Sequence, residues 1–205
     1  MTELIPPDGW IGPGRPRLAA PAPAERGWLL GLISRVARRM GRDDVPDVIA
    51  VLHLNPRLFW PWLFFASRMM PNGQLPSRLR ELVILRTAWL CRSRYEWGQH
   101  VDIGLRVGLT DEQVLAVTRG PEAFVGTPEH AALLACDQMV AQRFIEDATW
   151  QALVKQLGKK QVIELMLLAG HYVMIAGFLN SSGLVLEPPI EAKLQAFHAR
   201  IAARA

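Results

Sequence analysis

The stretch RLRELVILRTAWL, residues 78–90, decides the fold class of this chain. Its apolar side chains cover most of the circumference of a helix, which is typical of a central helix that other helices surround. The turn sequence PNGQLPS, residues 71–77, precedes this stretch, and Ser77 is its predicted N-cap. Because no stretch alternates apolar and polar residues as a strand does, the sequence predicts an all-α protein.

The remaining helices are predicted from apolar periodicity and from their start and stop signals. They are expected over approximately 28–40, 46–54, 56–70, 94–107, 110–118, from 127 onward, 149–157 and 160–180. Thr110 with Gln113 fits a capping box, and Thr127 followed by Pro128 fits a helix start. Pro61 should kink the 56–70 helix or make it begin afresh.

The two ends of the chain differ from its middle. Residues 1–26 are rich in proline and glycine, which predicts an extended arm wrapped on the body or on a neighbouring subunit. Residues 27–186 are expected to form one helical domain. After the prolines at 188 and 189, residues 187–205 predict a basic amphipathic tail helix.

Composition limits the partners. Half of the 205 residues are hydrophobic, and the formal net charge is only +4. The densest basic stretch, RVARRMGR at 35–42, fits the solvated face of a helix better than a surface for an anionic partner. We therefore expect no nucleic-acid partner.

The cysteines, the N-terminus and the longest apolar stretch together predict a cytoplasmic protein. Cys91 and Cys136 form neither a CxxC motif nor a disulfide framework, which favours a reducing compartment. The N-terminus lacks the basic start and apolar run of a signal peptide. The apolar stretch 165–179 is interrupted by His171 and is shorter than the ~20 residues that span a bilayer. It predicts a buried helix and no membrane segment.

CRSRYEWGQH, residues 91–100, carries the candidate chemistry. Glu96 and His100 lie one helical turn apart at the edge of an apolar arc, so they should face the interior or a pocket rim. The short CRS break predicts a helical hairpin that brings Glu81 towards both. A carboxylate beside a histidine orients the imidazole, and three such groups around an apolar pocket could transfer protons.

Structural explanations compete with this one. Ser93 and Glu96 also fit a capping box, Glu81 suits the positive end of its helix, and His100 fits a half-buried, hydrogen-bonded histidine. His171 shares a helix face with Glu164, so this pair either lines the same pocket or forms a structural hydrogen bond. The Glu-x-x-x-His spacing lacks the form of known zinc signatures, so no metal is expected.

The stretch RELVILRTAWLCRSRYEWGQHVDIGLRVGLTDEQVLAV, residues 80–117, resembles the carboxymuconolactone decarboxylase family, which includes the AhpD-like alkylhydroperoxidases. The resemblance implies an AhpD-like helical bundle that forms homo-oligomers, as a trimer, dimer or hexamer. AhpD-like peroxidases carry a Glu, then Cys-x-x-Cys, then three residues and a His. Counted back from His100, the cysteine positions fall on Ser93 and Glu96, and the Glu position falls on Glu81.

The resemblance therefore implies that dithiol peroxidase chemistry is lost and that the decarboxylase branch is the better analogue. It suggests a cofactor-free acid–base enzyme that decarboxylates or isomerises a small organic acid or lactone. His100 would donate the proton, Glu96 would orient it, and Glu81 would act as base or shape the charge. Ser93, Trp97 and His171 are candidate substrate contacts. The alternatives are a peroxidase that uses Cys91 and a non-catalytic ligand-binding or assembly protein.

Overall fold

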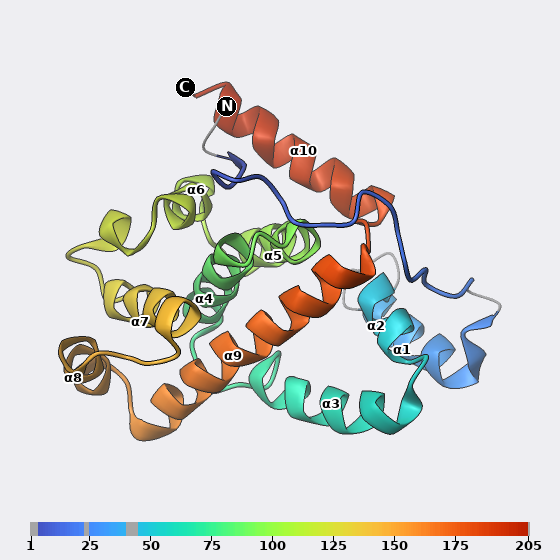
Figure 1. The fold of residues 1–205 in the computed structure, drawn as a ribbon, viewed down its shortest axis with the longest axis horizontal. Coiled ribbons are helices and arrows are strands. Elements are labelled where there is room, and N and C mark those ends of the chain that lie inside the picture. The colour runs from blue at the N-terminus through green and yellow to red at the C-terminus, as the bar shows by residue number, and fades with distance from the viewer. Residues whose placement is uncertain (1–3, 23–24, 40–44, 205) are drawn as a thin grey trace.

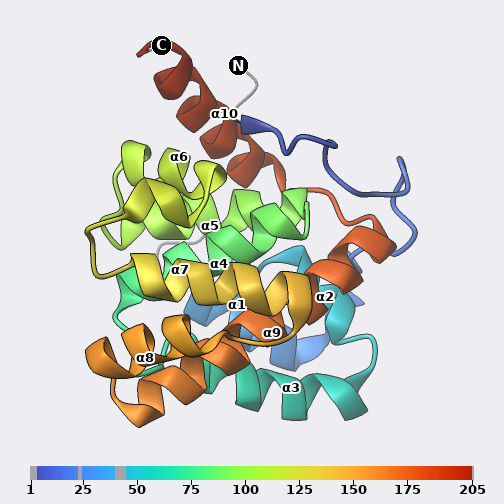
Figure 2. The same cartoon turned by 60° about the vertical axis from the view of Figure 1, so that its left-hand side comes forward.

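The computed structural model describes residues 4–22, 25–39 and 45–204, which fold into ten α-helices (Figures 1 and 2). Their bounds are α1 Gly27–Arg39, α2 Asp47–Leu52, α3 Pro56–Met69, α4 Ser77–Leu90, α5 Arg94–Arg106, α6 Asp111–Arg119, α7 His130–Gln142, α8 Asp147–Gln156, α9 Lys159–Ser182 and α10 Pro188–Ala202. The described residues contain no strand, so the all-α prediction is confirmed. Most of the basic stretch 35–42 has side chains outside the described part, so its solvated face stays a prediction.

The central helix is α4. Every residue from Arg80 to Trp89 is buried, and the helix packs against α5, α6, α7 and α9. Leu82 and Leu85 belong to one hydrophobic cluster, whereas Val83 and Ile84 belong to a second cluster on the opposite side. The apolar circumference read from the sequence therefore corresponds to a helix with a core on each side.

Four local predictions at helix ends and within helices can be compared with the structure. The capping box of Thr110 and Gln113 is present at the start of α6. Ser77 is not an N-cap, because Pro76 occupies that position in an extended conformation and Ser77 is the first helical residue. Thr127 is not one either, since its hydroxyl donates to the Phe124 carbonyl at 2.9 Å and α7 begins at His130. The helix α3 runs through Pro61 without restarting. Pro61 is the sixth of the 14 residues of α3, and its missing N–H removes one intrahelical bond.

The long helix α9 is only partly buried. By length and composition it could cross a membrane, but half of its most apolar window is covered by the rest of the fold. It packs against α4, α5, α7 and α8. Its outer face exposes Ile163, Leu167 and Met174. The prediction of a buried helix therefore holds for one face and is wrong for the other.

The N-terminal arm wraps on the chain's own body, where it runs past α5 and the end of α9 (Figure 1). Leu4 is buried in the core, and the Trp10 ring meets Trp89 edge to face at 5.6 Å. Further along, the amides of Arg17 and Leu18 both donate to the Ser182 carbonyl, at 2.7 and 3.1 Å. Backbone bonds of this kind fix an extended segment that has no helix or sheet of its own.

Candidate active site

A pocket of about 630 Å³ opens between two groups of helices. Side chains from α1, α2 and α3 form one wall, and side chains from α4, α5 and α9 form the other. The lining is mainly apolar. The polar and aromatic side chains that could contact a ligand are Trp62, Ser67, Arg80, Tyr95, Glu96, Gln99, His100, Arg106, His171 and Tyr172. A large apolar pocket with a few converging polar groups is the usual form of a small-molecule site.

His100 is bonded to Glu81 in the wall of this pocket. His100 Nδ1 lies 2.7 Å from Glu81 Oε2, and the Glu81 side chain is completely buried. Burial alone would raise the pKa of Glu81, but His100 and then Arg80 outweigh it, so the net pKa is lowered and Glu81 is ionised. An ionised Glu81 accepts the hydrogen of Nδ1, which leaves Nε2 as the nitrogen available to a ligand.

The α4–α5 hairpin produces this pairing. The two helices are joined at Arg92, which takes the left-handed conformation with φ 51°. The amide of Ser93 donates back to the Ala88 carbonyl at 2.9 Å, which closes the turn. Glu81 and His100 are 19 residues apart, and the antiparallel return places them side by side. The predicted approach of Glu81 to His100 is therefore present.

Glu96 differs from its prediction. It is not bonded to His100, which turns to Glu81 instead. It forms no capping box with Ser93, whose hydroxyl is also unpartnered. Both carboxyl oxygens of Glu96 are buried and bond to none of the residues that the structure describes. Burial raises the pKa of Glu96 well above its usual range, which favours the neutral carboxylic acid over the carboxylate.

Arg80 is a site residue that the sequence analysis missed. Its Nε lies 3.1 Å from Glu81 Oε1, and its side chain is 7% exposed. The other two guanidinium nitrogens bond to no residue of the described ranges, and Arg80 lines the pocket. An arginine directly before Glu81 in an apolar helix was the available signal. Its guanidinium is a ready receptor for an anionic ligand group.

The three predicted substrate contacts lie in different places. Ser93 and Trp97 are buried but do not line the pocket, and Trp97 packs against Trp89 at 5.2 Å between ring centroids. His171 does line it and stacks on Trp62 at 5.9 Å. Burial lowers the pKa of His171 to about 4, so its imidazole is neutral.

Glu164 does not pair with His171 as the shared helix face suggested. Its two carboxylate oxygens accept from the backbone amides of Gln74 and Leu75, at 2.7 and 3.0 Å. These bonds fix the turn that precedes α4. Glu164 binds the turn because the turn offers two backbone N–H donors that otherwise lack an acceptor. Two such donors stabilise a carboxylate more than one neutral imidazole would.

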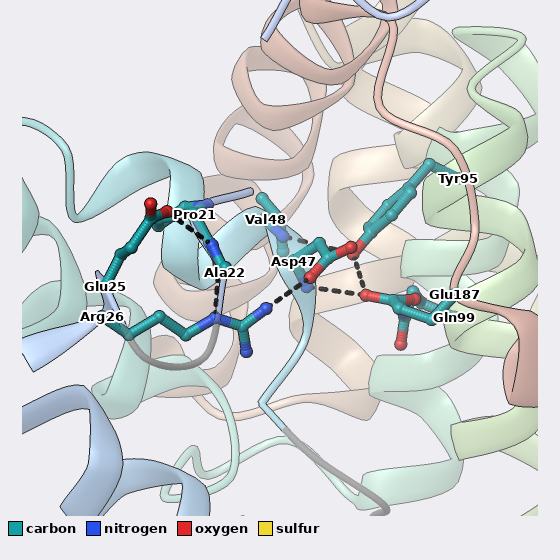
Figure 3. A network of polar contacts seen from close by, with 9 residues as sticks. All are labelled: Pro21, Ala22, Glu25, Arg26, Asp47, Val48, Tyr95, Gln99 and Glu187. Atoms are coloured by element: carbon teal, nitrogen blue, oxygen red, sulfur yellow. Dashed lines mark hydrogen bonds and ion pairs between the residues drawn. The ribbon is translucent and has the colours of Figure 1, made fainter. Parts of the chain in front are cut away.

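A second feature missed in the sequence is the network around Glu187 (Figure 3). Its Oε1 accepts from Tyr95 Oη and from the Asp47 amide, both at 2.6 Å, and its Oε2 accepts from Gln99 Nε2 at 2.6 Å. Tyr95 Oη in turn accepts from the Val48 amide at 3.2 Å. Since Tyr95, Gln99 and Val48 line the pocket, Glu187 ties α2 to α5 across it.

The cysteines lie outside the pocket lining. Cys91 is half-buried, and burial, followed by Glu96, raises the pKa of its thiol to about 11 against an opposing effect of Arg143. Burial likewise raises the pKa of Cys136 to about 12. Both side chains are therefore thiols near pH 7, the poorly nucleophilic form. Among the described residues, no group of three or more His, Cys, Asp or Glu is placed to hold a metal ion.

Comparison with known proteins gives a family match and several similar folds. The carboxymuconolactone decarboxylase family matches residues 56–138, from the start of α3 into α7. No curated protein sequence matches the chain. An uncharacterized peroxidase-related protein from Silicibacter sp. TM1040 is 12% identical with a TM-score of 0.75, over 87% of this chain and 95% of that one.

Two further solved structures are similar over most of both chains. An alkylhydroperoxidase AhpD core protein from Ralstonia eutropha JMP134 is 16% identical with a TM-score of 0.73, over 85% of this chain and 94% of that one. The debrominase Bmp8, solved in complex with 2,3,4-tribromopyrrole, is 14% identical with a TM-score of 0.71, over 87% and 96%. At these identities the likeness establishes a shared fold, and the chemistry must be argued from the site.

Proposed function

We propose that the chain belongs to the carboxymuconolactone decarboxylase/AhpD-like superfamily, whose family model matches residues 56–138, and that it is a cofactor-free enzyme that moves protons on a small organic acid or lactone. The observation that carries this proposal is the buried Glu81–His100 pair in the wall of a largely apolar pocket. A carboxylate that fixes one imidazole nitrogen and leaves the other towards a cavity is the arrangement of an acid–base catalyst.

In an isomerisation, Nε2 of neutral His100 removes a proton from a carbon next to a carbonyl. The electron pair of the broken C–H bond moves to the carbonyl oxygen, which gives an enolate. The N–H of the imidazolium exchanges with solvent, and Nε2 then delivers a proton to a different carbon. Glu81 stabilises the intervening imidazolium, because its negative charge lies 2.7 Å from the other nitrogen.

In a decarboxylation, the bond between the carboxylate carbon and its neighbour breaks first. Carbon dioxide leaves, and the electron pair remains on the substrate as an enolate or a related carbanion. The imidazolium of His100 then donates its Nε2 proton to the carbon. Both reactions use Nε2 of His100 to move the proton, and both need a nearby positive charge, which Arg80 supplies.

The pocket also favours a class of substrate. The two guanidinium nitrogens of Arg80 that do not contact Glu81 favour a substrate with an anionic group. The apolar walls favour a small substrate that is otherwise hydrocarbon. The neighbouring debrominase was solved with a small ring, 2,3,4-tribromopyrrole. We extend this expectation of a small cyclic compound to the present chain. A carboxylated lactone or a cyclic unsaturated acid combines these properties.

Peroxidase chemistry is the weaker candidate. Neither position that corresponds to a redox cysteine holds one, since they are Ser93 and Glu96. Cys91 is a protonated thiol outside the pocket lining, so it supplies no thiolate beside His100.

The test is proton exchange in deuterated water. A panel of carboxylated lactones and cyclic unsaturated acids is incubated with the protein, and NMR follows deuterium entering the substrate carbon. His100→Asn should abolish the enzyme-dependent exchange. His130→Asn, on α7 and outside the pocket, is the matched control and should retain it. Binding without exchange in the wild type would favour a non-catalytic ligand-binding protein.

A further inference from the structure

The carboxyl group of Glu96 is the least satisfied polar group in the pocket wall. Glu96 is 2% exposed, and neither of its oxygens has a hydrogen-bond partner within the described part of the chain. A buried polar group without a partner destabilises a fold, and a buried carboxylate does so far more. Such a group calls for a functional explanation.

The polar side chains around Glu96 do not bond to its carboxyl group. Arg80 and His100 both direct their bonds to Glu81. His171 is neutral and its Nδ1 is unpartnered, while Tyr95 is bonded to Glu187. His100 therefore has near it one ionised carboxylate with two partners, Glu81, and one carboxyl in the pocket lining with none, Glu96. This division separates the roles of the two glutamates.

We propose that Glu96 acts as a neutral carboxylic acid whose O–H donates a hydrogen bond to a carbonyl oxygen of the substrate. The inference deepens the proposed function and rests on it. It adds a specific requirement to the substrate class, namely a carbonyl group next to the reacting carbon. A carboxylic acid kept neutral in an apolar site is an effective donor to an oxygen on which negative charge develops.

The spacing on α5 supports this role. Glu96 and His100 are four residues apart, so their side chains emerge on one face with Cβ atoms about 5–6 Å apart. A carbonyl oxygen at Glu96 then brings the adjacent carbon towards Nε2 of His100. Arg80, on the neighbouring helix, remains for the anionic group. Three contacts fix the orientation of a small molecule in an otherwise apolar pocket.

The test compares two ligands that differ at a single position. Benzoylformate carries a carbonyl where phenylacetate carries a methylene, and both are small aromatic carboxylates. Isothermal titration should show that the wild type binds benzoylformate about tenfold more tightly, as expected for one hydrogen bond. Glu96→Leu should bind both ligands equally, whereas Glu96→Gln should keep most of the preference because its amide also donates. Glu122→Gln, an exposed change in the short 3-10 helix Pro121–Phe124 before α7, is the control.

Infrared spectroscopy supplies an independent measurement on the unliganded protein. The wild type at neutral pH should show a protonated-carboxyl C=O band that is missing in Glu96→Gln and shifts when benzoylformate binds. An unchanged ligand preference in Glu96→Leu, or the absence of this band, would overturn the role of Glu96 alone. If neither ligand binds the wild type, the pocket does not take small carboxylates, and the proposed function falls with the inference.

Discussion

Glu81 and His100 lie 2.7 Å apart on successive helices, whereas Glu96, one turn from His100 on its own helix, does not bond to it. The two glutamates beside His100 thus have pKa values shifted in opposite directions. His100 and Arg80 lower the pKa of Glu81 against its burial, whereas burial raises the pKa of Glu96. This difference leads to separable predictions for activity and for the pH dependence of stability.

The first prediction concerns catalysis. Glu81→Gln removes the charge that stabilises the imidazolium of His100, so proton exchange should fall about 100-fold or more. Glu96→Gln retains a hydrogen-bond donor and should lower it less. Exchange rates measured by NMR for both variants check this order. Equal losses in the two variants would contradict the assignment of Glu81 as the partner of His100.

A second prediction concerns stability at rising pH. The folded protein holds a proton on Glu96 that the unfolded chain releases above the ordinary range of glutamate, so the unfolded state binds fewer protons. Stability is then lost as pH rises from that range towards the raised pKa of Glu96, by at most about 1.4 kcal/mol per pH unit. The Glu96→Gln variant has no titrating group at this position. Its free energy of unfolding, relative to that of the wild type, should therefore increase as the pH rises. Urea unfolding of both proteins from about pH 4 to about pH 8 measures these free energies.

Glu81 should show the opposite sign. The pKa of Glu81 is lower in the folded protein than in the unfolded chain. The stabilisation of the folded state by ionised Glu81 is therefore complete above the ordinary pKa range of glutamate. It is lost as the pH falls through the lowered pKa. Acid unfolding of Glu81→Gln should accordingly depend less on pH than that of the wild type. A parallel pH dependence in the two proteins would mean that Glu81 titrates normally.

The redox prediction is negative. The protein should not reduce alkyl hydroperoxides with a dithiol donor, because Cys91 has a pKa raised to about 11 and no partner cysteine at the redox position. A coupled peroxidase assay checks this. Turnover that disappears in Cys91→Ser but survives in Cys136→Ser would refute it.

Glu187→Ala should loosen the wall of the pocket. The change removes the acceptor for Tyr95, Gln99 and the Asp47 amide, so the free energy of unfolding should fall by about 2–3 kcal/mol. Hydrogen exchange should quicken at Asp47 and Val48, at the start of α2. Glu191→Ala is the matched control, since it removes a partly exposed pair with Arg94 and an exposed hydrogen bond from Gln195 and should change little.

The central hairpin could be predicted from sequence because its signals are local. The apolar circumference of residues 78–90 marks α4, and the short break after Leu90 forces α5 to fold back. The spacing of Glu96 and His100 correctly placed both side chains at the pocket. It could not show which carboxylate meets the imidazole, because contacts between helices depend on their rotation and depth.

Contacts between distant segments were beyond sequence reasoning. Glu187 meets Asp47 across 140 residues, and no periodic pattern links the two. Ser93 illustrates the other failure. Its S-x-x-E spacing fits a capping box, yet the Glu96 side chain goes into the pocket wall and the cap is not formed. A motif specifies which bonds are available, whereas packing decides which of them form.

The docking of the N-terminal arm gives the protein a built-in optical reporter. Trp10 from the arm lies 5.6 Å from Trp89 and 6.2 Å from Trp97, which themselves lie 5.2 Å apart. Indoles at such separations share their electronic excitation, so the three rings should give a strong near-ultraviolet circular dichroism signal. Only Trp10 belongs to the arm, so release of the arm would remove one of the three rings from the cluster and change this spectrum. The far-ultraviolet signal of the helices would stay nearly constant. Attachment of the arm can thus be followed in solution without any added label.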